Sequence, residues 1–467
     1  MSVTVHNRPQ FGADNSWAAH YRASILLGIP LIGAQLAQLA INTTDVILVG
    51  KLGTTHLAAI VLATQVYFTV FIFGSGFTNA VVPLAAQAQG RGDTVSVRRS
   101  VRMGMWVAIL YSILTAPVLW LVEPILVAAG QQPAVAALAS EYLHIAQWAM
   151  FPSLLFMVLR AFLSGLERAS VILYVTIFTL ILNAFLCYLL IYGRWGLPAL
   201  GIEGAAIAAL MVSALSFIIT AWYIQRVPEL HSYNLFVRFW KPDWPVFFEV
   251  VALGAPIALT ILAETGLFMA ASLLMGRLGT TELAAHGIAM QFASLAFMIP
   301  VGLSQVAAVR VGLSAGRHDL EGIKRAAITI LTLGAGCSVV GSLIFALYPR
   351  ELATLYLDTG RPDAAEVLAY VGPLIILAGV FQLTDGMQAI ASGLLRGLKD
   401  TKIPMLLALI SYWPIGFVFA WVFAFPLGFG GIGVWIGFVV GLLAAAIFLN
   451  YRFYRIYRAL KARTLSI

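Results

Sequence analysis

The stretch GKLGTTHLAA at residues 50–59 recurs almost unchanged as GRLGTTELAA at residues 276–285. The same offset of 226 residues pairs Gly28-x-Pro30 with Gly254-x-Pro256, and Asp93 with Asp319. Because no gap is needed across about 70 residues, the match is an internal repeat and not a chance similarity. The sequence therefore predicts two homologous halves with the same orientation.

The composition assigns the chain to the membrane class. Of its 467 residues, 61% are hydrophobic and only 10% are charged, whereas soluble proteins carry about 25% charged residues. The net charge of +8 is explained by loop topology, so we expect no nucleic-acid partner. Cys187 and Cys337 lie in apolar segments and form no redox or metal motif. Residues 1–22 lack the apolar core of a signal peptide, so we expect the first apolar segment to be retained.

Twelve apolar stretches can cross a hydrocarbon core of about 30 Å as helices, which takes about 20 residues each. They are residues 23–45, 57–82, 101–122, 141–163, 170–192, 204–226, 247–269, 283–309, 326–348, 364–388, 404–426 and 431–451. With both termini on one side, 22 Lys and Arg residues fall on that side and 5 on the other, which predicts cytoplasmic termini.

The predicted fold is an all-α integral membrane protein of 12 helices in two six-helix lobes, related by an axis along the membrane normal. The expected parts are a cytoplasmic N-terminal segment at 1–22, lobes at 23–226 and 247–451, a cytoplasmic linker at 227–246 and a basic cytoplasmic tail at 452–467.

The acidic residues Asp45, Glu264 and Asp385 lie in apolar segments. A carboxylate at membrane depth costs at least about 2.5 kcal/mol, so such residues are usually paired, neutralised or functional. We interpret them as cation-binding groups of a transporter. Because Glu264 and Asp385 both belong to the second half, they can share one cavity and hold a proton or Na⁺ between them. The alternative is that the acids are protonated and only pack helices.

Other polar residues accompany these acids at helical spacing. Gln35, Gln38, Asn42 and Asp45 fall within an arc of about 80°, which predicts one inward-facing stripe. Interhelical packing is the alternative role for such a stripe. Further candidates are Thr260 before Glu264, Gln382 and Gln388 around Asp385, and Asn183 as a partner for the Asp45 face.

Aromatic and histidine residues give weaker signals. Phe297, Phe381 and Tyr412, together with Gln291, are candidates for a substrate cavity, because aromatic rings attract cations by about 0.5–2 kcal/mol each. Packing is the more common role of a membrane aromatic. We interpret His286 as a hydrogen-bonded structural residue. The sequence contains no phosphate-binding loop and no nucleophile–base pair or metal cluster at membrane depth, so we expect neither ATP use nor an enzyme.

Taken together, these motifs resemble the multidrug and toxic compound extrusion (MATE) transporters, in particular the NorM-like bacterial branch. The resemblance covers about residues 22–450 and rests on Gly28-x-Pro30 with Asp45, Val49-Gly50-x-Leu52-Gly53, Gly254-x-Pro256 with Glu264, Gly279-Thr280-Thr281-x-Leu283-Ala284-Ala285-His286, and Asp385 before Ser392-Gly393-x-x-Arg396-Gly397. The resemblance implies a V-shaped pair of six-helix bundles in the bacterial inner membrane. It also implies export of cationic amphipathic drugs, driven by Na⁺ or H⁺.

Position by position, the resemblance makes Glu264 and Asp385 the second-lobe cation site, and Asp45 with Asn183 the first-lobe cluster. Cys187 stands where some members carry a second acid. We expect a monomer with no cofactor besides the transported ion, which Glu264 and Asp385 would bind if it is Na⁺. Alternatives are a lipid-linked precursor flippase, which would need a cationic cavity, or a non-transporting membrane scaffold.

Overall fold

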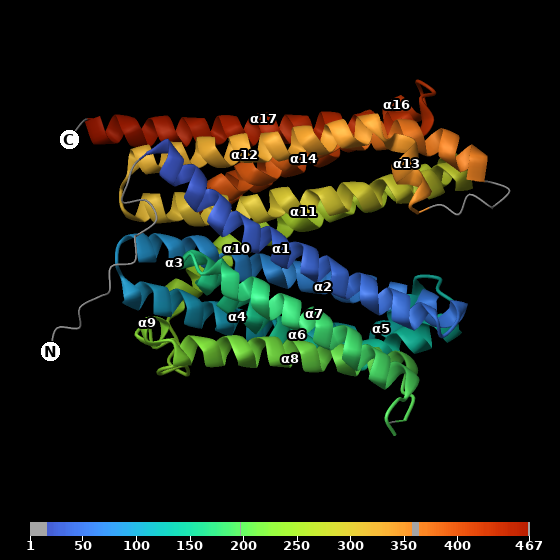
Figure 1. Cartoon of the computed structure of the whole chain (residues 1–467), viewed down its shortest axis with the longest axis horizontal. Coiled ribbons are helices and arrows are strands. Elements are labelled where there is room, and N and C mark those ends of the chain that lie inside the picture. Colours follow the sequence, from blue (N-terminus) through green and yellow to red (C-terminus); the bar gives the residue numbers. More distant parts are fainter. Residues whose placement is uncertain (1–15, 197, 357–363, 466–467) are drawn as a thin grey trace. The chain divides into compact units, whose positions relative to one another are not determined.

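The computed structural model describes residues 16–196, 198–356 and 364–465. The described residues form helices joined by short loops (Figure 1). The first half contains α1 Trp17–Gly50, α2 Thr54–Asn79, α3 Val81–Gly90, α4 Thr94–Trp120, α5 Val122–Ala128, α6 Pro133–Gly165, α7 Ala169–Tyr192, α8 Gly201–Arg226 and α9 Pro228–His231. The second half contains α10 Trp244–Leu278, α11 Thr280–Gly316, α12 Leu320–Leu347, α13 Pro349–Thr354, α14 Ala364–Gly397, α15 Lys402–Ile410, the π-helix η1 Ser411–Phe417, α16 Val418–Ala424 and α17 Gly430–Leu465.

The prediction of twelve membrane-spanning helices is confirmed for the described part of the chain. Twelve helical segments are long and apolar enough to span a membrane, with α2 and α3 forming one segment and α15 to α16 another. Several helices extend beyond the predicted apolar stretches. For example, the predicted stretch 141–163 lies inside α6, which begins at Pro133 and ends at Gly165. Hydropathy marks only the part of a helix that lies in hydrocarbon, and the polar helix ends continue past it. Residues 1–15 of the expected N-terminal segment and 466–467 of the tail lie outside the described residues.

The sequence repeat corresponds to repeated local structure. Asp93 and Asp319, which the 226-residue offset pairs, each cap the helix that follows. The Asp93 carboxylate accepts from the Ser96 amide at 3.0 Å, and the Asp319 carboxylate accepts from the Gly322 amide at 2.8 Å. These bonds satisfy amide groups that a helix start leaves without intrahelical partners. Hydrogen bonds from the Ser96 hydroxyl and amide also hold the pKa of Asp93 below its ordinary value.

The helices group into two compact units. The N-terminal unit runs from Gly33 to Thr265, and the C-terminal unit combines the chain up to Ile32 with the chain from Gly266 onward. The two boundaries therefore fall inside α1 and α10, the helices that carry the paired prolines Pro30 and Pro256. The lobes expected from the repeat at 23–226 and 247–451 stay a prediction.

Close packing explains how α1 and α10 are shared. In the first part of α1, a Cβ on Gly28 would contact Leu303 of α11 at 3.5 Å, and both residues belong to the C-terminal unit. The last part of α1 packs on α7 in the N-terminal unit, where the Tyr192 hydroxyl donates to the Leu48 carbonyl at 2.6 Å. The two repeat-related helices thus each begin in one unit and end in the other.

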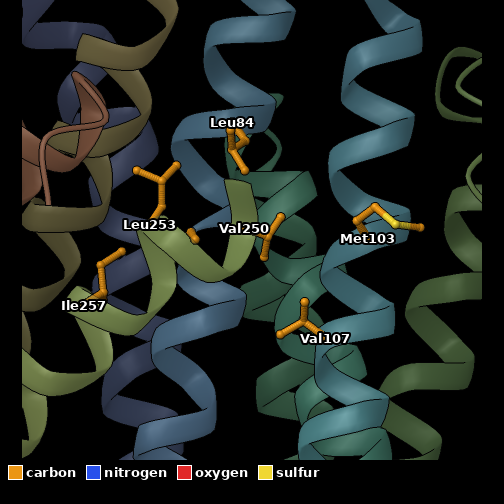
Figure 2. Packing of buried hydrophobic residues seen from close by; sticks show 7 residues of the cluster. Leu84, Met103, Val107, Val250, Leu253 and Ile257 are labelled. Atoms are coloured by element: carbon orange, nitrogen blue, oxygen red, sulfur yellow. The ribbon is translucent and has the colours of Figure 1, made fainter. Parts of the chain in front are cut away.

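The core of the N-terminal unit includes the first part of α10. Val250, Leu253 and Ile257 pack with Leu84 of α3 and with Met103 and Val107 of α4, as Figure 2 shows. All six side chains are buried, so this part of α10 is fixed by apolar packing. The cluster lies directly after the linker, and it therefore also fixes where the linker ends.

Candidate functional site

Asp45 is the centre of a hydrogen-bonded group in the N-terminal unit. Its Oδ1 atom accepts from Asn183 Nδ2 at 2.6 Å and from the Cys187 thiol at 3.4 Å. Asn183 and Cys187 lie one turn apart on α7 and are both buried, whereas Asp45 is half-buried. Two donors directed at one carboxylate oxygen stabilise the ionised form of Asp45. The structure thus brings the predicted partner Asn183 to Asp45 and adds Cys187 as a second donor.

The rest of the α1 stripe is not uniformly packed. Gln35 accepts a hydrogen bond from Arg160 Nη2 of α6 at 3.1 Å, but Gln38 and Asn42 are exposed. Packing partners are thus described for the two ends of the stripe, and the expectation that the whole stripe faces inward, toward protein or water, stays a prediction. An arc of about 80° is wide enough to reach from a packed face to an open one, so helical spacing alone could not separate the two.

Asp385 is the centre of a second buried group, in the C-terminal unit. Its side chain is 1% exposed, and its Oδ1 atom accepts from Gln388 Nε2 at 3.1 Å. The other end of the same amide, Gln388 Oε1, accepts from the Tyr412 hydroxyl at 2.9 Å. Gln388 and Tyr412 are also buried, and Tyr412 lies in the π-helix η1. π-helical turns are rare and occur frequently at functional sites.

The π-helix has a local cause and a local consequence. Pro414 lies within η1 and has no amide hydrogen to donate, which disturbs the regular hydrogen bonding of the span. The chain then packs very closely on α17, because a Cβ on Gly416 would lie 3.3 Å from the Gly441 Cα atom. Tyr412 is thereby held at a fixed position facing Gln388.

The other predicted polar residues lie near these acids along their own helices. Gln382 is buried, and its Nε2 atom lies 3.5 Å from both the Ser338 carbonyl and the Ser342 hydroxyl of α12. Thr260 is buried and donates to the Pro256 carbonyl at 2.8 Å. Glu264 is half-buried and lies one turn after Thr260 on α10. Thr260 and Glu264 belong to the N-terminal unit, whereas Asp385 belongs to the C-terminal unit. The sharing of one site by Glu264 and Asp385 stays a prediction.

The predicted cavity aromatics separate into buried and accessible residues. Phe381 is buried, with its ring centre 5.4 Å from that of Trp435 and 5.9 Å from that of Phe268. Phe297 is half-buried and Gln291 is exposed. The role of these residues and of Tyr412 in a substrate cavity stays a prediction.

His286 packs within the C-terminal unit, and its role as a structural histidine stays a prediction. It is buried, its Nε2 atom lies 3.3 Å from the Ser272 hydroxyl, and its ring packs edge-on to Trp435 at 5.7 Å. Trp435, which was not expected from the sequence, is fully buried and packs against both Phe381 and His286. A tryptophan inside an apolar span was the only available signal for it.

The described partners of Asp45 and Asp385 are hydrogen-bond donors, so the carboxylate oxygens themselves are the atoms that could bind a proton or a hard cation. Carboxylate, amide and hydroxyl oxygens are the ligands that Na⁺ and similar ions prefer. Among the residues that the structure describes, no group of three or more His, Cys, Asp and Glu side chains could hold a metal ion. The hydrogen-bond partners described for Asp45 and Asp385 are neutral side chains.

Twelve apolar helices in repeated halves, with hydrogen-bonded carboxylates inside the spans, define a multi-pass membrane protein of the transporter class. The MatE family model matches residues 30–189 and 256–422. The chain belongs to the MATE family of transporters.

Relatives and solved structures are similar over nearly the whole chain. A probable multidrug resistance protein NorM of Rhizobium meliloti (strain 1021) is 71% identical over 450 residues, covering 96% of each chain. A protein of the same name from Agrobacterium fabrum is 57% identical over 453 residues, covering 97% of each. The crystal structure of the eukaryotic MATE transporter AtDTX14 has a TM-score of 0.84 at 22% identity and covers 96% of this chain and 100% of its own. A crystal structure of MATE in the straight conformation has a TM-score of 0.86 at 19% identity, with 95% and 97% covered. At these identities the two structures show a shared fold.

Proposed function

We propose that the chain is a cation-coupled multidrug antiporter that exports cationic amphipathic compounds by alternating access. Relatives that are named probable multidrug resistance proteins support drugs as the substrate. The coupling ion is Na⁺ or H⁺, bound by Asp385, Glu264 and Asp45, with Na⁺ held at Glu264 and Asp385 if sodium is the ion. The protein works as a monomer in the bacterial inner membrane, with both termini in the cytoplasm.

The observation that carries this proposal is the buried group of Asp385, Gln388 and Tyr412. A carboxylate that is 1% exposed inside a span is costly unless a proton, a cation or hydrogen bonds neutralise it. Gln388 supplies a donor to Asp385, and Tyr412 fixes the orientation of that amide. Binding of a proton or Na⁺ at this carboxylate would alter its contact with Gln388, and such a local change is what couples ion occupancy to conformation.

Asp45 provides a second site of the same kind in the N-terminal unit. Its partners are the Asn183 amide and the Cys187 thiol. Because the thiol is a weak donor and carries no charge beside Asp45, this cluster contains a single acidic group. It can therefore bind one proton or one monovalent cation. Entry of one such charge down a potential of about 100 mV supplies about 2.3 kcal/mol for export.

Alternating access would use the two helices that are shared between the units. α1 and α10 each begin in one unit and end in the other, so a rearrangement of the units must bend or shift them. Pro30 lies two residues before the end of the first segment at Ile32, and Pro256 lies nine residues before the boundary at Thr265. Proline is a common cause of helix bending. In this proposal, binding of the ion at the acids changes which arrangement of the two units is favoured.

The test is transport by purified protein in proteoliposomes loaded with a fluorescent organic cation. An inward Na⁺ pulse and an inward pH pulse are applied separately, and dye movement is recorded against vesicles without protein. We expect one of the two pulses to drive dye export and the other to have little effect. Dye movement that is the same with and without any ion gradient would disprove cation coupling.

A further inference from the structure

The linker between α8 and α10 is an ordered structure built onto α4. Both nitrogens on one edge of the Arg99 guanidinium donate to the Asp243 carboxylate, with Nη2 to Oδ1 at 3.1 Å. Trp106 Nε1 donates to the Phe239 carbonyl at 2.9 Å, and Arg102 Nη1 donates to the Arg238 carbonyl at 3.3 Å. All of these residues belong to the N-terminal unit. Three side chains of α4 therefore fix the linker at three successive places.

The backbone of the linker adopts a specific turn. Arg238 has a φ angle of 56°, in the left-handed region that a residue with a side chain seldom occupies. Its carbonyl also accepts from the Lys241 amide at 3.0 Å, which closes the turn. A strained residue persists where its surroundings fix it, so the turn places the side chains around it in set directions.

The fixed linker presents apolar side chains outward. Tyr233 and Leu235 are buried, whereas Val237 is exposed and Trp240 is 76% exposed. Trp244 and Phe248, one turn apart at the start of α10, are 52% and 62% exposed. The opposite face of α10 is the one that packs into the core shown in Figure 2. We call the outward set, Val237, Arg238, Trp240, Lys241, Trp244 and Phe248, the linker platform.

The surroundings of the platform carry an excess of positive charge. Arg238 and Lys241 are exposed on either side of Trp240. The bases Arg98, Arg99 and Arg102 of α4 lie close enough to one another to interact electrostatically, and Asp243 and Asp93 act on Arg99. Residues 93–102 and 237–249 carry the bases Arg98, Arg99, Arg102, Arg238 and Lys241, and the acids Asp93, Asp243 and Glu249. Bases therefore outnumber acids in this region.

We propose that the linker platform binds anionic phospholipid headgroups of the leaflet that it faces. Exposed tryptophan rings favour the boundary between headgroups and acyl chains. Basic residues beside these rings attract anionic lipids, and each Lys or Arg near the membrane surface raises the affinity for anionic lipid about five-fold. The platform lies at the level where this boundary is expected, because the predicted apolar stretch 247–269 of α10 begins three residues after Trp244. Exposed aromatic rings, adjacent bases and this position favour a lipid surface over a protein partner.

The test uses the full-length protein in nanodiscs and the fluorescence of Trp240. Nanodiscs contain either brominated phosphatidylglycerol in phosphatidylcholine, or brominated phosphatidylcholine in unlabelled phosphatidylglycerol, at the same bromine content. The difference in emission between wild type and Trp240→Phe isolates the signal of this one tryptophan. We expect brominated phosphatidylglycerol to quench Trp240 at least twice as strongly as brominated phosphatidylcholine.

A charge variant and a matched control complete the experiment. Arg238→Gln with Lys241→Gln should abolish the preference and weaken phosphatidylglycerol retention, measured by native mass spectrometry, by about ten- to thirty-fold. Arg91→Gln with Arg317→Gln removes the same charge from two exposed loop positions outside the platform and should change retention less than three-fold. Equal quenching by both lipids, or no quenching of Trp240, would overturn the proposal, and the second outcome would point to a protein partner instead. Neither readout depends on transport.

Discussion

The hydrogen bond from Tyr412 to Gln388 should be measurable as a coupling energy. Tyr412→Phe removes the hydroxyl that donates to Gln388 Oε1 at 2.9 Å, and Gln388→Met removes the amide while keeping the length of the side chain. Both side chains are buried, so water cannot replace the lost partner. Each single variant is therefore expected to lower the free energy of unfolding by about 1–3 kcal/mol.

The double variant isolates the energy of the Tyr412–Gln388 hydrogen bond from the other effects of each substitution. Once either partner is gone, removing the other costs less, because the shared bond has already been lost. Hydrogen bonds between membrane helices measured in this way average about 0.6 kcal/mol and reach about 1.7. We therefore expect Tyr412→Phe with Gln388→Met to be less destabilising than the sum of the single variants by about 0.6–1.7 kcal/mol.

The assay is reversible unfolding of the purified protein in mixed micelles with increasing denaturing detergent. Tyr370→Phe is the matched control, since it removes a hydroxyl that accepts from the Gly431 amide at 3.0 Å in the same unit. Tyr370 and Gln388 are 18 residues apart on α14, or about 27 Å, so their effects should add within about 0.5 kcal/mol. Additive effects for the Tyr412 and Gln388 pair would refute the network around Asp385.

Two further predictions concern packing and pH. Gly437→Ala should destabilise the protein by about 1–3 kcal/mol, because its new Cβ would lie 2.6 Å from the Ala420 Cβ. Gly336→Ala on α12 is the control, because a Cβ there would meet no heavy atom within 4 Å among the described residues, and it should be neutral or stabilising. Equal losses of stability for both variants in the unfolding assay would contradict this packing argument. The hydrogen-bonded Arg99 guanidinium holds the pKa of Asp243 below its ordinary value. The pair therefore stabilises the folded protein fully at pH values above the unfolded pKa of about 3.9. This contribution to stability is lost as the pH falls through the lower pKa of the folded state. The melting-temperature difference between wild type and Asp243→Asn should therefore shrink below about pH 4, whereas a constant difference from pH 6 to pH 2.5 would exclude this role.

The features that depend on local pattern could be predicted from the sequence. Apolar length gave the twelve spans, and the repeat paired Asp93 with Asp319 before either was known to cap a helix. The cost of charge in hydrocarbon selected Asp45 and Asp385, and helical spacing selected Gln388. The structure places Asn183 and Gln388 within hydrogen-bonding distance of Asp45 and Asp385, respectively.

The pairing of Asp45 with Asn183 was expected, but other contacts between distant segments could not be predicted. Tyr412 was selected as a cavity aromatic, but its hydroxyl bonds to Gln388, 24 residues earlier in the chain. Pro414 was visible in the sequence, yet only the packing of η1 against α17 shows that the span accommodates it by a π-helix. The boundaries of the units inside α1 and α10 also arise from tertiary packing, which hydropathy does not report.

Ion-driven export by Asp385→Asn tests the central claim most directly. The change keeps the size of the side chain and removes its charge, and Asp400→Asn, at an acid outside the spans that pairs with Arg452, serves as the control. Export of a fluorescent cation from proteoliposomes is recorded under whichever gradient, Na⁺ or H⁺, drives the wild type. We expect Asp385→Asn to lose at least 90% of gradient-driven export, because about 1.4 kcal/mol of lost ion binding corresponds to a roughly ten-fold effect. Asp400→Asn should keep most of its export. Full gradient-driven export by Asp385→Asn would contradict the account.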